Sequence, residues 1–387
     1  MEPINTDFFR ISDTFDETQR LTAETTRKFV HDEFLPHIEH AYESGTFPLN
    51  LIPRMGALGM LGAQLEGYGC AGLDAISYGL IMKELERGDS GLRSFASVQG
   101  ALVMYPIHAF GNETQKQTWL PRLANGKAIG CFGLTEPDFG SNPAGMKTSA
   151  KKVGAKWVLN GSKTWITNAP LADVAVVWAR TPEGIRGFLV EKGMPGFSTQ
   201  EIKGKLSLRA SITGSLYFDN CELPEENLLP HTTGLKNALM CLSQARYGIA
   251  WGVVGAAEDA FNEALNYSKN RIMFDKPLAG FQLVQRKLAL MATQISTANL
   301  VAVQLAKLKE TGTLHPAQIS MAKQNNVAMA LECARTARDI LGANGISGEY
   351  HCMRHACNLE SVYTYEGTND IHLLVVGQQL TGLQAFS

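Results

Sequence analysis

The alternation of apolar and polar residues divides the chain into three regions. Up to about residue 127, apolar positions recur at the spacing of three and four residues that amphipathic helices show. Predicted helices cover residues 15–42, 51–61, 75–87, a segment that begins at Leu92 after a Ser90-Gly91 break, and residues 113–123. The first region is therefore predicted to be helical.

The second region begins at Ala128, where short runs rich in β-branched and aromatic residues replace the helical period. Predicted strands cover residues 129–134, 174–178, 187–191 and 215–218, and residues 152–167 are predicted to form a hairpin that turns at Asn160-Gly161. Turns recur about every ten residues, which is typical of an antiparallel barrel or sandwich. Pro224 and Pro230 mark the end of this region.

Helical spacing returns at Leu235 and continues to the end of the chain. Long predicted helices cover residues 235–269, 281–309 and 316–341, and two shorter segments follow. Long helices joined by short loops indicate a bundle. The predicted fold class is therefore α+β, with a helical domain over residues 1–127, a β domain over 128–231 and a helical bundle over 232–387.

Charge and hydropathy narrow the classes of function. The 387 residues carry 35 Lys and Arg against 37 Asp and Glu, a net charge of −2 without a basic stripe, so no nucleic acid or anionic membrane is expected as a partner. The run nearest to a membrane span, residues 290–308, is interrupted by Gln294, Asn299 and Gln304. No membrane insertion is expected.

The cysteines and the N-terminal residues bear on the compartment. Seven scattered cysteines without a Cys-x-x-Cys motif favour free thiols in a reducing compartment. Residues 1–7 resemble neither a secretory signal nor an Arg-rich transit peptide, although a processed chain would look the same. We expect a location in the bacterial cytoplasm, or in the mitochondrial matrix if a transit peptide has been removed.

Two motifs resemble known sites without the context that such sites require. The glycine pattern of residues 67–72 lies between helical segments, so we interpret it as a turn before a helix near Asp74 and not as a dinucleotide fingerprint. His351 and His355 are four residues apart beside Cys352 and Cys357, but no second Cys/His cluster accompanies them. Core packing is the expected role of that segment, and no metal site is predicted.

The segment from Tyr365 to Asp370 places a carboxylate directly before a glycine and just ahead of an apolar helix. Thr368 or Asn369 is the expected N-cap, with Asp370 in the first turn, where its charge suits the helix dipole. Gly367 permits positive φ or a close approach to a bound molecule. Glu366 is then either an acid–base group held on a tight turn or a solvated carboxylate beside a capped helix.

Four further stretches agree with the first alternative: residues 131–141, 163–168, 245–250 and 271–282. With residues 365–370 they resemble the acyl-CoA dehydrogenase family, in order, over essentially the whole chain. Residues 90–94, 97–99, 365–372 and 381–386 resemble its glutaryl-CoA dehydrogenase branch. The departures from the family pattern are local: Asp275-Lys276, Asn142 and Ala343 stand where other residues are more usual.

The resemblance implies a helical domain, an antiparallel β-barrel and a four-helix bundle with FAD between them. Phe132, Leu134, Thr135 and Ser141 match one segment along the flavin, and Trp165, Ile166 and Thr167 match a segment on its other side. Further matches to cofactor contacts, the first six of them across a subunit boundary, are Arg271, Phe274, Gln282, Asp339, Leu341, Gly342, Thr368 and Asp370. A shared site implies at least a dimer, and the family's homotetramer is expected.

The resemblance also assigns roles in catalysis. Glu366 matches the base that removes the α-proton of the thioester, and some relatives place that base at the position of Ala245. Arg93, with Ser94, matches the group that binds a distal carboxylate. Glu86 and Tyr365 match positions near that carboxylate, Tyr365 as a donor and Glu86 as a partner of Arg93. From the residues alone, Arg93 is either a surface charge beside a helix start or a cation held in a pocket. Burial without a partner would be costly, and a ligand carboxylate would complete the pair. Ser141, Arg246, Tyr247 and Gly367 complete the implied substrate contacts.

Three functions follow as alternatives. The first is dehydrogenation and decarboxylation of glutaryl-CoA to crotonyl-CoA, as in lysine and tryptophan degradation, with an electron-transferring flavoprotein as acceptor. The second is a non-decarboxylating relative, or a dehydrogenase or oxidase of another short acyl-CoA. The third is a catalytically silent acyl-CoA or partner-binding module on the same scaffold, against which the presence of Glu366 argues.

Overall fold

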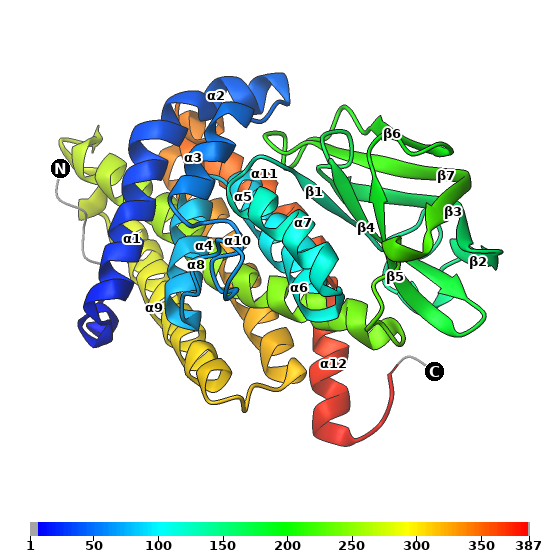
Figure 1. The fold of residues 1–387 in the computed structure, drawn as a ribbon. Helices are drawn as coiled ribbons and strands as arrows, with labels where there is room; N and C mark the ends of the chain where they lie inside the picture. The colour runs from blue at the N-terminus through cyan, green and yellow to red at the C-terminus, as the bar shows by residue number, and fades with distance from the viewer. Residues whose placement is uncertain (1–6, 386–387) are drawn as a thin grey trace.

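The structure, a computed structural model, describes residues 7–385. The first six residues of the acidic N-terminal segment and Phe386 of the C-terminal motif lie outside the described residues. Helices from both ends of the chain pack together on one side, and the strands of the middle region form a separate layer beside them (Figure 1). The predicted α+β class is confirmed, whereas the domain boundaries at 127/128 and 231/232 remain predictions.

The first region is helical, as predicted. Its helices are α1 Glu17–Phe29, α2 Leu35–Ser44, α3 Ile52–Ala57, α4 Ala75–Gly88, α5 Ser90–Ser97, α6 Tyr105–Phe110 and α7 Glu113–Ala124. A π-helical turn, Val30–Phe34, joins α1 to α2, so the long helix predicted at 15–42 is nearly continuous. The helix predicted at 51–61 is shorter, because only Ile52–Ala57 is α-helical after a 3-10 turn at Leu49–Leu51.

The predicted break at Ser90-Gly91 is displaced by one residue. Asp89 is extended, with φ −167°, and its side chain accepts a hydrogen bond from the Gly91 N–H at 2.7 Å, so α5 already begins at Ser90. The other carboxylate oxygen of Asp89 accepts from Arg354 Nε at 3.1 Å and from Asn358 Nδ2 at 2.8 Å. The same residue therefore caps α5 and ties it to the C-terminal region.

The strands of the middle region form one sheet of mixed direction. They are β1 Gly130–Gly133, β2 Ser149–Val153, β3 Lys156–Thr167, β4 Val174–Thr181, β5 Gly184–Glu191, β6 Phe197–Glu201 and β7 Thr213–Pro224. The order is β1-β4-β2-β3-β7-β6, with β5 also paired to β4. Most pairs are antiparallel, but β1 and β4 run parallel with Phe132 opposite Val176, a feature that the antiparallel prediction did not include.

The hairpin turn predicted at Asn160-Gly161 is wrong. β2 and β3 pair with Val153 opposite Lys156, so the two-residue turn is Gly154-Ala155, with Gly154 at φ +62°. Asn160 and Gly161 lie inside β3, where the register with β7 shifts. A Cβ at Gly161 would lie 2.6 Å from Thr148 Oγ1, so glycine here serves an irregular strand and not a turn.

The third region contains the long helices α8 Leu235–Asn270, α9 Gln282–Glu310 and α10 Pro316–Leu341, and then α11 His351–Thr364 and α12 Asn369–Thr381. A small hairpin, β8 Ile272–Met273 and β9 Lys276–Pro277, lies between α8 and α9. By length and composition α9 could cross a membrane, contrary to the expectation from the sequence. However, 44% of its apolar window is buried and its Asn299 binds Glu258 of α8, so we interpret it as a core helix.

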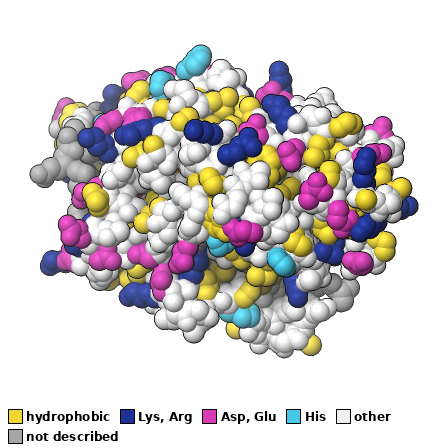
Figure 2. Space-filling model, viewed as in Figure 1, with side chains coloured by type: hydrophobic (Ala, Val, Ile, Leu, Met, Phe, Trp, Pro, Cys, Tyr) yellow, Lys and Arg dark blue, Asp and Glu magenta, His cyan; other side chains and the backbone are white. Residues whose placement is uncertain are grey.

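Helix α8 packs closely against α4 because small residues face that helix. A Cβ at Gly255 would lie 1.9 Å from the Lys83 carbonyl oxygen, and a Cβ at Gly252 would lie 2.1 Å from Glu86 Oε2. The Gly- and Ala-rich character of α8 therefore reflects the short distance between the two helices. On the surface, acidic and basic side chains are intermixed across the face seen in Figure 2.

Candidate active site

Glu366 lies on the turn between α11 and α12 and has a left-handed backbone, with φ +53°. Gly367 follows at φ +93°, where a Cβ would lie 2.8 Å from His372 Nε2. The Thr368 hydroxyl accepts a hydrogen bond from the Ile371 N–H at 3.2 Å and caps α12. Of the two predicted N-caps, Thr368 and Asn369, the first is therefore the one observed. Two consecutive positive φ values hold the Glu366 side chain in a direction that an ordinary turn does not give.

Two cations hold the carbonyl groups of this turn. Lys323 of α10 is 1% exposed, and its Nζ donates to the carbonyl oxygens of Tyr365 at 2.8 Å and Gly367 at 2.7 Å. Arg246 of α8 donates from Nε to the Glu366 carbonyl oxygen at 2.6 Å. Three successive carbonyls are thus bound from two helices, which fixes the turn from the side of the bundle.

The carboxyl group of Glu366 is buried although the residue as a whole is partly exposed. Its Oε2 has no hydrogen-bond partner among residues 7–385. Burial raises the pKa of Glu366 above its ordinary value, and the Arg93, Arg246 and Lys323 cations partly oppose that rise. A carboxyl group with these properties suits proton exchange nearer to neutral pH than a solvated one.

Arg93 lies beside this turn and is completely buried. Its Nε donates to Glu86 Oε2 at 2.7 Å, and its Nη2 donates to the Tyr365 hydroxyl. Glu86, also fully buried, therefore neutralises Arg93, in agreement with the partner role that the resemblance implied for it. Burial lowers the pKa of Arg93, but the Glu86 carboxylate more than offsets this and raises it, so the guanidinium stays charged.

One edge of the Arg93 guanidinium remains open. Its Nη1 is buried and has no partner within residues 7–385. Ser94 follows in α5 and is 3% exposed. The Glu86–Arg93 pair fits beneath α8 because Gly252 has no side chain. The structure thus combines an ion pair with one unused donor next to Tyr365 and Glu366.

The two segments expected along the flavin lie side by side. The Thr164 N–H donates to the Thr135 carbonyl oxygen at 2.9 Å, so the loop after β1 runs beside the end of β3. Phe132, Leu134 and Ile166 are buried, Thr135 and Thr167 are partly exposed, and Trp165 is 62% exposed with φ +59°. An aromatic face and two hydroxyl side chains are therefore presented together at the sheet edge.

Lys163 fixes the relation between these two segments and was not found from the sequence. Its fully buried Nζ donates to the Leu134 carbonyl oxygen at 3.0 Å and to Glu136 Oε1 at 2.9 Å. Burial raises the pKa of Glu136, but hydrogen bonds from Lys163 and Thr148 outweigh that effect and lower it to about 2. A lysine followed by an aromatic strand gives no sequence signal for such a role.

Several expected contact residues lie apart from the Glu366 turn. The Tyr247 hydroxyl donates to the Ala75 carbonyl oxygen at 2.7 Å in the interior between α4 and α8, and Ser141 is exposed in the loop after β1. Arg271, Phe274 and Gln282 are exposed around the small hairpin, with Phe274 85% exposed. Of the residues at the end of α10, Asp339 and Gly342 are exposed and Leu341 is buried, while Asp370 is exposed in α12.

The hairpin is distant from the Glu366 turn along α8. Arg246 and Arg271 are separated by 25 positions along and just beyond the helix, or about 38 Å at the rise of an α-helix. Figure 1 shows the segment after α8 on the side of the helical region away from the sheet. The chain therefore presents two separate groups of expected cofactor residues.

Sequence reasoning missed Lys323 and His372 at the turn itself. Lys323 lies 43 residues before Glu366 in an ordinary amphipathic helix, so its contacts depend on tertiary structure. His372 is fully buried in α12, and neither ring nitrogen has a partner among the described residues. Burial lowers the pKa of His372 to about 3 and keeps the ring neutral.

All three regions of the chain match known proteins. Family models match in order: acyl-CoA dehydrogenase N-terminal domain over residues 16–127, middle domain over 131–221 and C-terminal domain over 232–381. The human mitochondrial short-chain specific acyl-CoA dehydrogenase is 36% identical over 371 residues, covering 94% of this chain and 90% of the relative.

Two solved structures are also similar. The glutaryl-CoA dehydrogenase of Mycobacterium smegmatis in complex with FADH2 is 52% identical, with a TM-score of 0.97 over 98% of both chains. The butyryl-CoA dehydrogenase of Megasphaera elsdenii is 34% identical, with a TM-score of 0.91 over 95% of this chain and 98% of that one. Because the family models span the helical, β and helical regions in order, the chain belongs to the acyl-CoA dehydrogenase family.

Proposed function

We propose that this acyl-CoA dehydrogenase oxidises glutaryl-CoA at the α,β-bond, with decarboxylation to crotonyl-CoA and CO2. The observation that carries the choice of substrate is Arg93, whose buried Nη1 has no partner among residues 7–385. A buried guanidinium nitrogen without an acceptor is costly, and a ligand carboxylate is the acceptor that matches its geometry. The 52% identity to a glutaryl-CoA dehydrogenase supports the same choice.

The residues at the sheet edge fit FAD, which the family binds. Trp165 offers an exposed aromatic face, and Thr135 and Thr167 offer hydroxyl groups beside it. We assign the flavin to the side of these two adjacent segments, with Phe132, Leu134 and Ile166 as its apolar support. When bound, FAD supplies the acceptor for the hydride that leaves the β-carbon of the substrate.

Arg271 and its neighbours serve a different cofactor molecule in this proposal. The hairpin lies about 38 Å along α8 from Arg246, which holds the turn that precedes the expected FAD contacts Thr368 and Asp370. We propose that the exposed hairpin contacts the adenine–pyrophosphate end of FAD in an adjacent subunit of a homotetramer. An exposed arginine in such a hairpin is suited to a phosphate group.

Glu366 performs the proton transfer. Its carboxylate accepts the α-proton of the thioester, and its backbone N–H donates to the thioester oxygen as negative charge develops there. Lys323 and Arg246 keep the turn in its left-handed conformation during this step. After CO2 departs, the protonated Glu366 returns a proton to the remaining dienolate, so the same group acts as base and then as acid.

The charge of the site favours an additional anion. The cations near Glu366 are Arg93, Arg246 and Lys323. The carboxylates beside them are those of Glu86 and Glu366. Burial lowers the pKa of Lys323 to about 7 and raises the pKa of Glu366, so positive charge at least balances negative charge at the site. The distal carboxylate of glutaryl-CoA would accept from Arg93 Nη1, while the Tyr365 hydroxyl, already bound to Nη2, orients that edge.

A second candidate is dehydrogenation of a monocarboxylic short-chain acyl-CoA. The charge of Arg93 is already balanced by Glu86, which favours this candidate, because the ion pair is neutral without any ligand. The 36% identity to the human short-chain specific enzyme agrees with it as well. A glutaryl-CoA dehydrogenase that stops at glutaconyl-CoA is a third possibility on the same scaffold.

Product analysis separates these candidates. The purified holoenzyme is incubated anaerobically with glutaryl-CoA or butyryl-CoA and a dye or an electron-transferring flavoprotein as acceptor, and the thioester products are identified by mass spectrometry. The proposal expects crotonyl-CoA and CO2 from glutaryl-CoA at a rate well above that for butyryl-CoA. Glutaconyl-CoA as the only product would contradict decarboxylation, and a preference for butyryl-CoA would contradict the substrate.

A further inference from the structure

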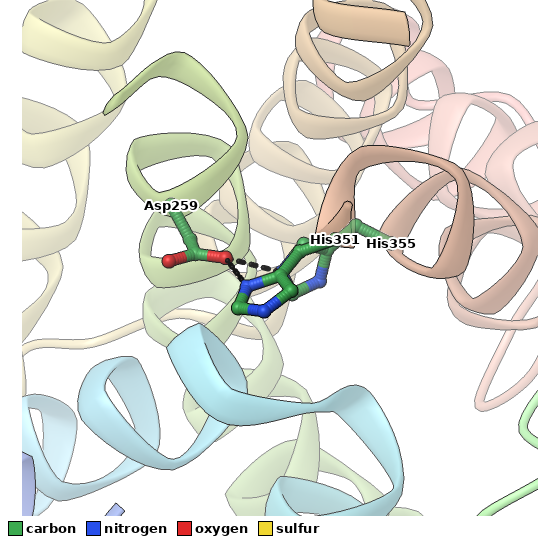
Figure 3. Close-up of side chains that lie close together, drawn as sticks. All are labelled: Asp259, His351 and His355. Carbon is green, nitrogen blue, oxygen red and sulfur yellow. Dashed lines mark hydrogen bonds and ion pairs between the residues drawn. The ribbon is translucent and has the colours of Figure 1, made fainter. Parts of the chain in front are cut away.

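A cluster of three potential metal ligands lies at the end of α11 that is remote from Glu366. His351 and His355 are one turn apart on α11, and Asp259 reaches them from α8. Asp259 Oδ2 lies 2.9 Å from His351 Nδ1 and 3.0 Å from His355 Nε2. Figure 3 shows the carboxylate and the two imidazole rings directed at one another across the space between the helices.

We propose that Asp259, His351 and His355 form a binding site for a divalent transition metal ion such as Zn²⁺. The site has no part in the dehydrogenation described above. It would join α8 to α11 and so stabilise the helical region that supports the Glu366 turn.

The three side chains have the ligand chemistry that such ions prefer. Two imidazole nitrogens and one carboxylate oxygen suit zinc and neighbouring metals, whereas calcium and magnesium prefer oxygen ligands alone. The three ligand atoms lie within 4.8 Å of one another. Metal–ligand bonds of about 2.0–2.2 Å require ligands somewhat more than 3 Å apart, so the observed spacing needs only a small expansion.

The carboxylate of Asp259 is directed at the two imidazole rings and is available to a cation. The nearby charged residues have other partners: Glu263 accepts the His351 and Cys352 backbone N–H groups, and Arg354 binds Asp89. A bound metal would replace the imidazole protons as the partner of Asp259.

The three side chains are accessible to an ion, and the helices that carry them are held in place. The side chains of His351 and Asp259 are 32% and 22% exposed, which leaves a path for an ion and room for a water as fourth ligand. His355 is fully buried and fixed within α11. Glu263 lies one turn after Asp259 on α8 and caps the first residues of α11, so the backbones that carry the ligands are already held together.

The site is separate from the catalytic turn. His351 begins α11 and Thr364 ends it, so the helix places about 20 Å between His351 and the start of the turn, and about 14 Å between His355 and that point. The core-packing role expected from the sequence holds for His355 but not for the half-exposed His351. The sequence could not indicate the third ligand, because Asp259 precedes His351 by 92 residues.

Zinc binding to the holoenzyme tests the proposal, with isothermal titration calorimetry and the thermal unfolding midpoint as readouts. The wild type should bind one equivalent per chain at this site, and its midpoint should rise by a few degrees at saturating Zn²⁺. His351→Ala and, independently, Asp259→Asn should abolish that equivalent and the shift. Both variants should retain FAD and metal-free dehydrogenation, since neither residue touches the catalytic turn.

His31→Ala provides a matched control. His31 Nδ1 also lies 2.8 Å from an aspartate oxygen, that of Asp32, but on an exposed surface and, within residues 7–385, without a third ligand. This variant should bind zinc as the wild type does. The proposal is overturned if the wild type shows no saturable binding, or if His351→Ala, Asp259→Asn and His31→Ala all keep the same stoichiometry and shift. Anomalous diffraction that places the ion on cysteines would overturn it as well.

Discussion

At the scale of single residues, the backbone of Glu366 matters as much as its carboxylate. The positive φ of Glu366 and Gly367 places the side chain, and three bound carbonyl groups maintain that conformation. The role of the carboxylate as a base could be proposed from the sequence through its resemblance to a family. The left-handed conformation of Glu366 could not be predicted, because glutamate is not among the residue types, such as glycine, asparagine and aspartate, that favour it.

Glu366→Gln tests the proton transfer. The amide keeps the size of the side chain but accepts no proton, so FAD should be retained while flavin reduction by substrate falls by roughly 10²–10⁴-fold or more. Stopped-flow absorbance of the flavin measures this rate. A variant that reduces its flavin nearly as fast as the wild type would show that another group is the base.

The pH dependence of the wild type gives an independent check of the same residue. The ordinary pKa of the group is 4.5, and burial raises it in the folded protein. Because the base must be ionised, kcat/KM should rise with pH through a value above 4.5. The effect on stability has the opposite sign. The folded state disfavours the ionised form of Glu366, so the wild type loses stability as the pH rises above the ordinary pKa. Glu366→Gln should therefore be at least as stable as the wild type above that pKa, and the advantage of the variant should vanish below it.

Lys323→Met tests whether the turn must be held. The change removes both hydrogen bonds to the turn, and a catalytic group displaced by about 1 Å costs on the order of 10²-fold in rate. We expect kcat to fall roughly 10- to 100-fold with little change in FAD content. Lys309→Met, at another largely buried lysine that binds Gln64 and Gln244, is the matched control. Equal losses in both variants would indicate general destabilisation.

At the scale of secondary-structure elements, the site depends on how closely α4, α5 and α8 pack. Gly252 leaves the space that the Glu86–Arg93 pair occupies, and Asp89 joins the start of α5 to α11. The helices themselves could be predicted from the spacing of apolar residues, which is a local property of the sequence. Their close approach could not be predicted, because a glycine in a helix pattern shows no sign of which side chain it accommodates.

In the middle region too, the local sequence pattern predicted strands but not how they pair in the tertiary structure. Most strands were found from alternation, yet the turn was placed at Asn160-Gly161 instead of Gly154-Ala155. Both dipeptides suit a tight turn, and pairing with β7 decides between them. β6 was missed because its residues are mostly exposed, which leaves no apolar alternation to detect.

Gly252→Ala tests the role of that packing. The added Cβ would lie 2.1 Å from Glu86 Oε2 and 3.3 Å from Arg93 Cδ, so the ion pair must shift. We expect a loss of about 1–3 kcal/mol in the free energy of unfolding, and a larger loss of activity with glutaryl-CoA than with butyryl-CoA.

Urea denaturation and steady-state kinetics measure the two effects. Gly377→Ala in α12 is the control, because nothing lies within 4 Å of the added Cβ there. If Gly252→Ala behaves like Gly377→Ala in both measurements, the close approach of α8 has no part in holding the ion pair.

At the scale of the whole molecule, the expected FAD contacts form two groups, and the hairpin after α8 lies on the side of the helical region away from the sheet (Figure 1). The sheet-edge segments and the Glu366 turn belong to one group, and the hairpin after α8 belongs to the other. Resemblance to a family supplied both groups from the sequence. The sequence pattern predicted α8 as one long helix, but it could not show how that helix separates the two groups in space.

Arg271→Met tests the proposed contact between subunits. Loss of a phosphate partner at an exposed hairpin should lower the FAD content of the purified protein while the protomer remains folded. Flavin absorbance per chain and size-exclusion chromatography measure cofactor content and assembly. Arg10→Met, at an exposed arginine paired with Asp13, is the control. An unchanged FAD content at low protein concentration would contradict the assignment.

The central claim is that Arg93 selects a substrate with a distal carboxylate. Because Arg93→Met alone would leave Glu86 as an unpaired buried charge, the informative comparison is Glu86→Gln against the double variant Arg93→Met/Glu86→Gln. The measurement is the anaerobic rate of flavin reduction by glutaryl-CoA and by butyryl-CoA. The account predicts that the double variant loses roughly 2–5 kcal/mol of transition-state stabilisation with glutaryl-CoA relative to Glu86→Gln, and keeps its rate with butyryl-CoA and its FAD content. Equal losses with the two substrates would show that Arg93 is structural and would contradict the account.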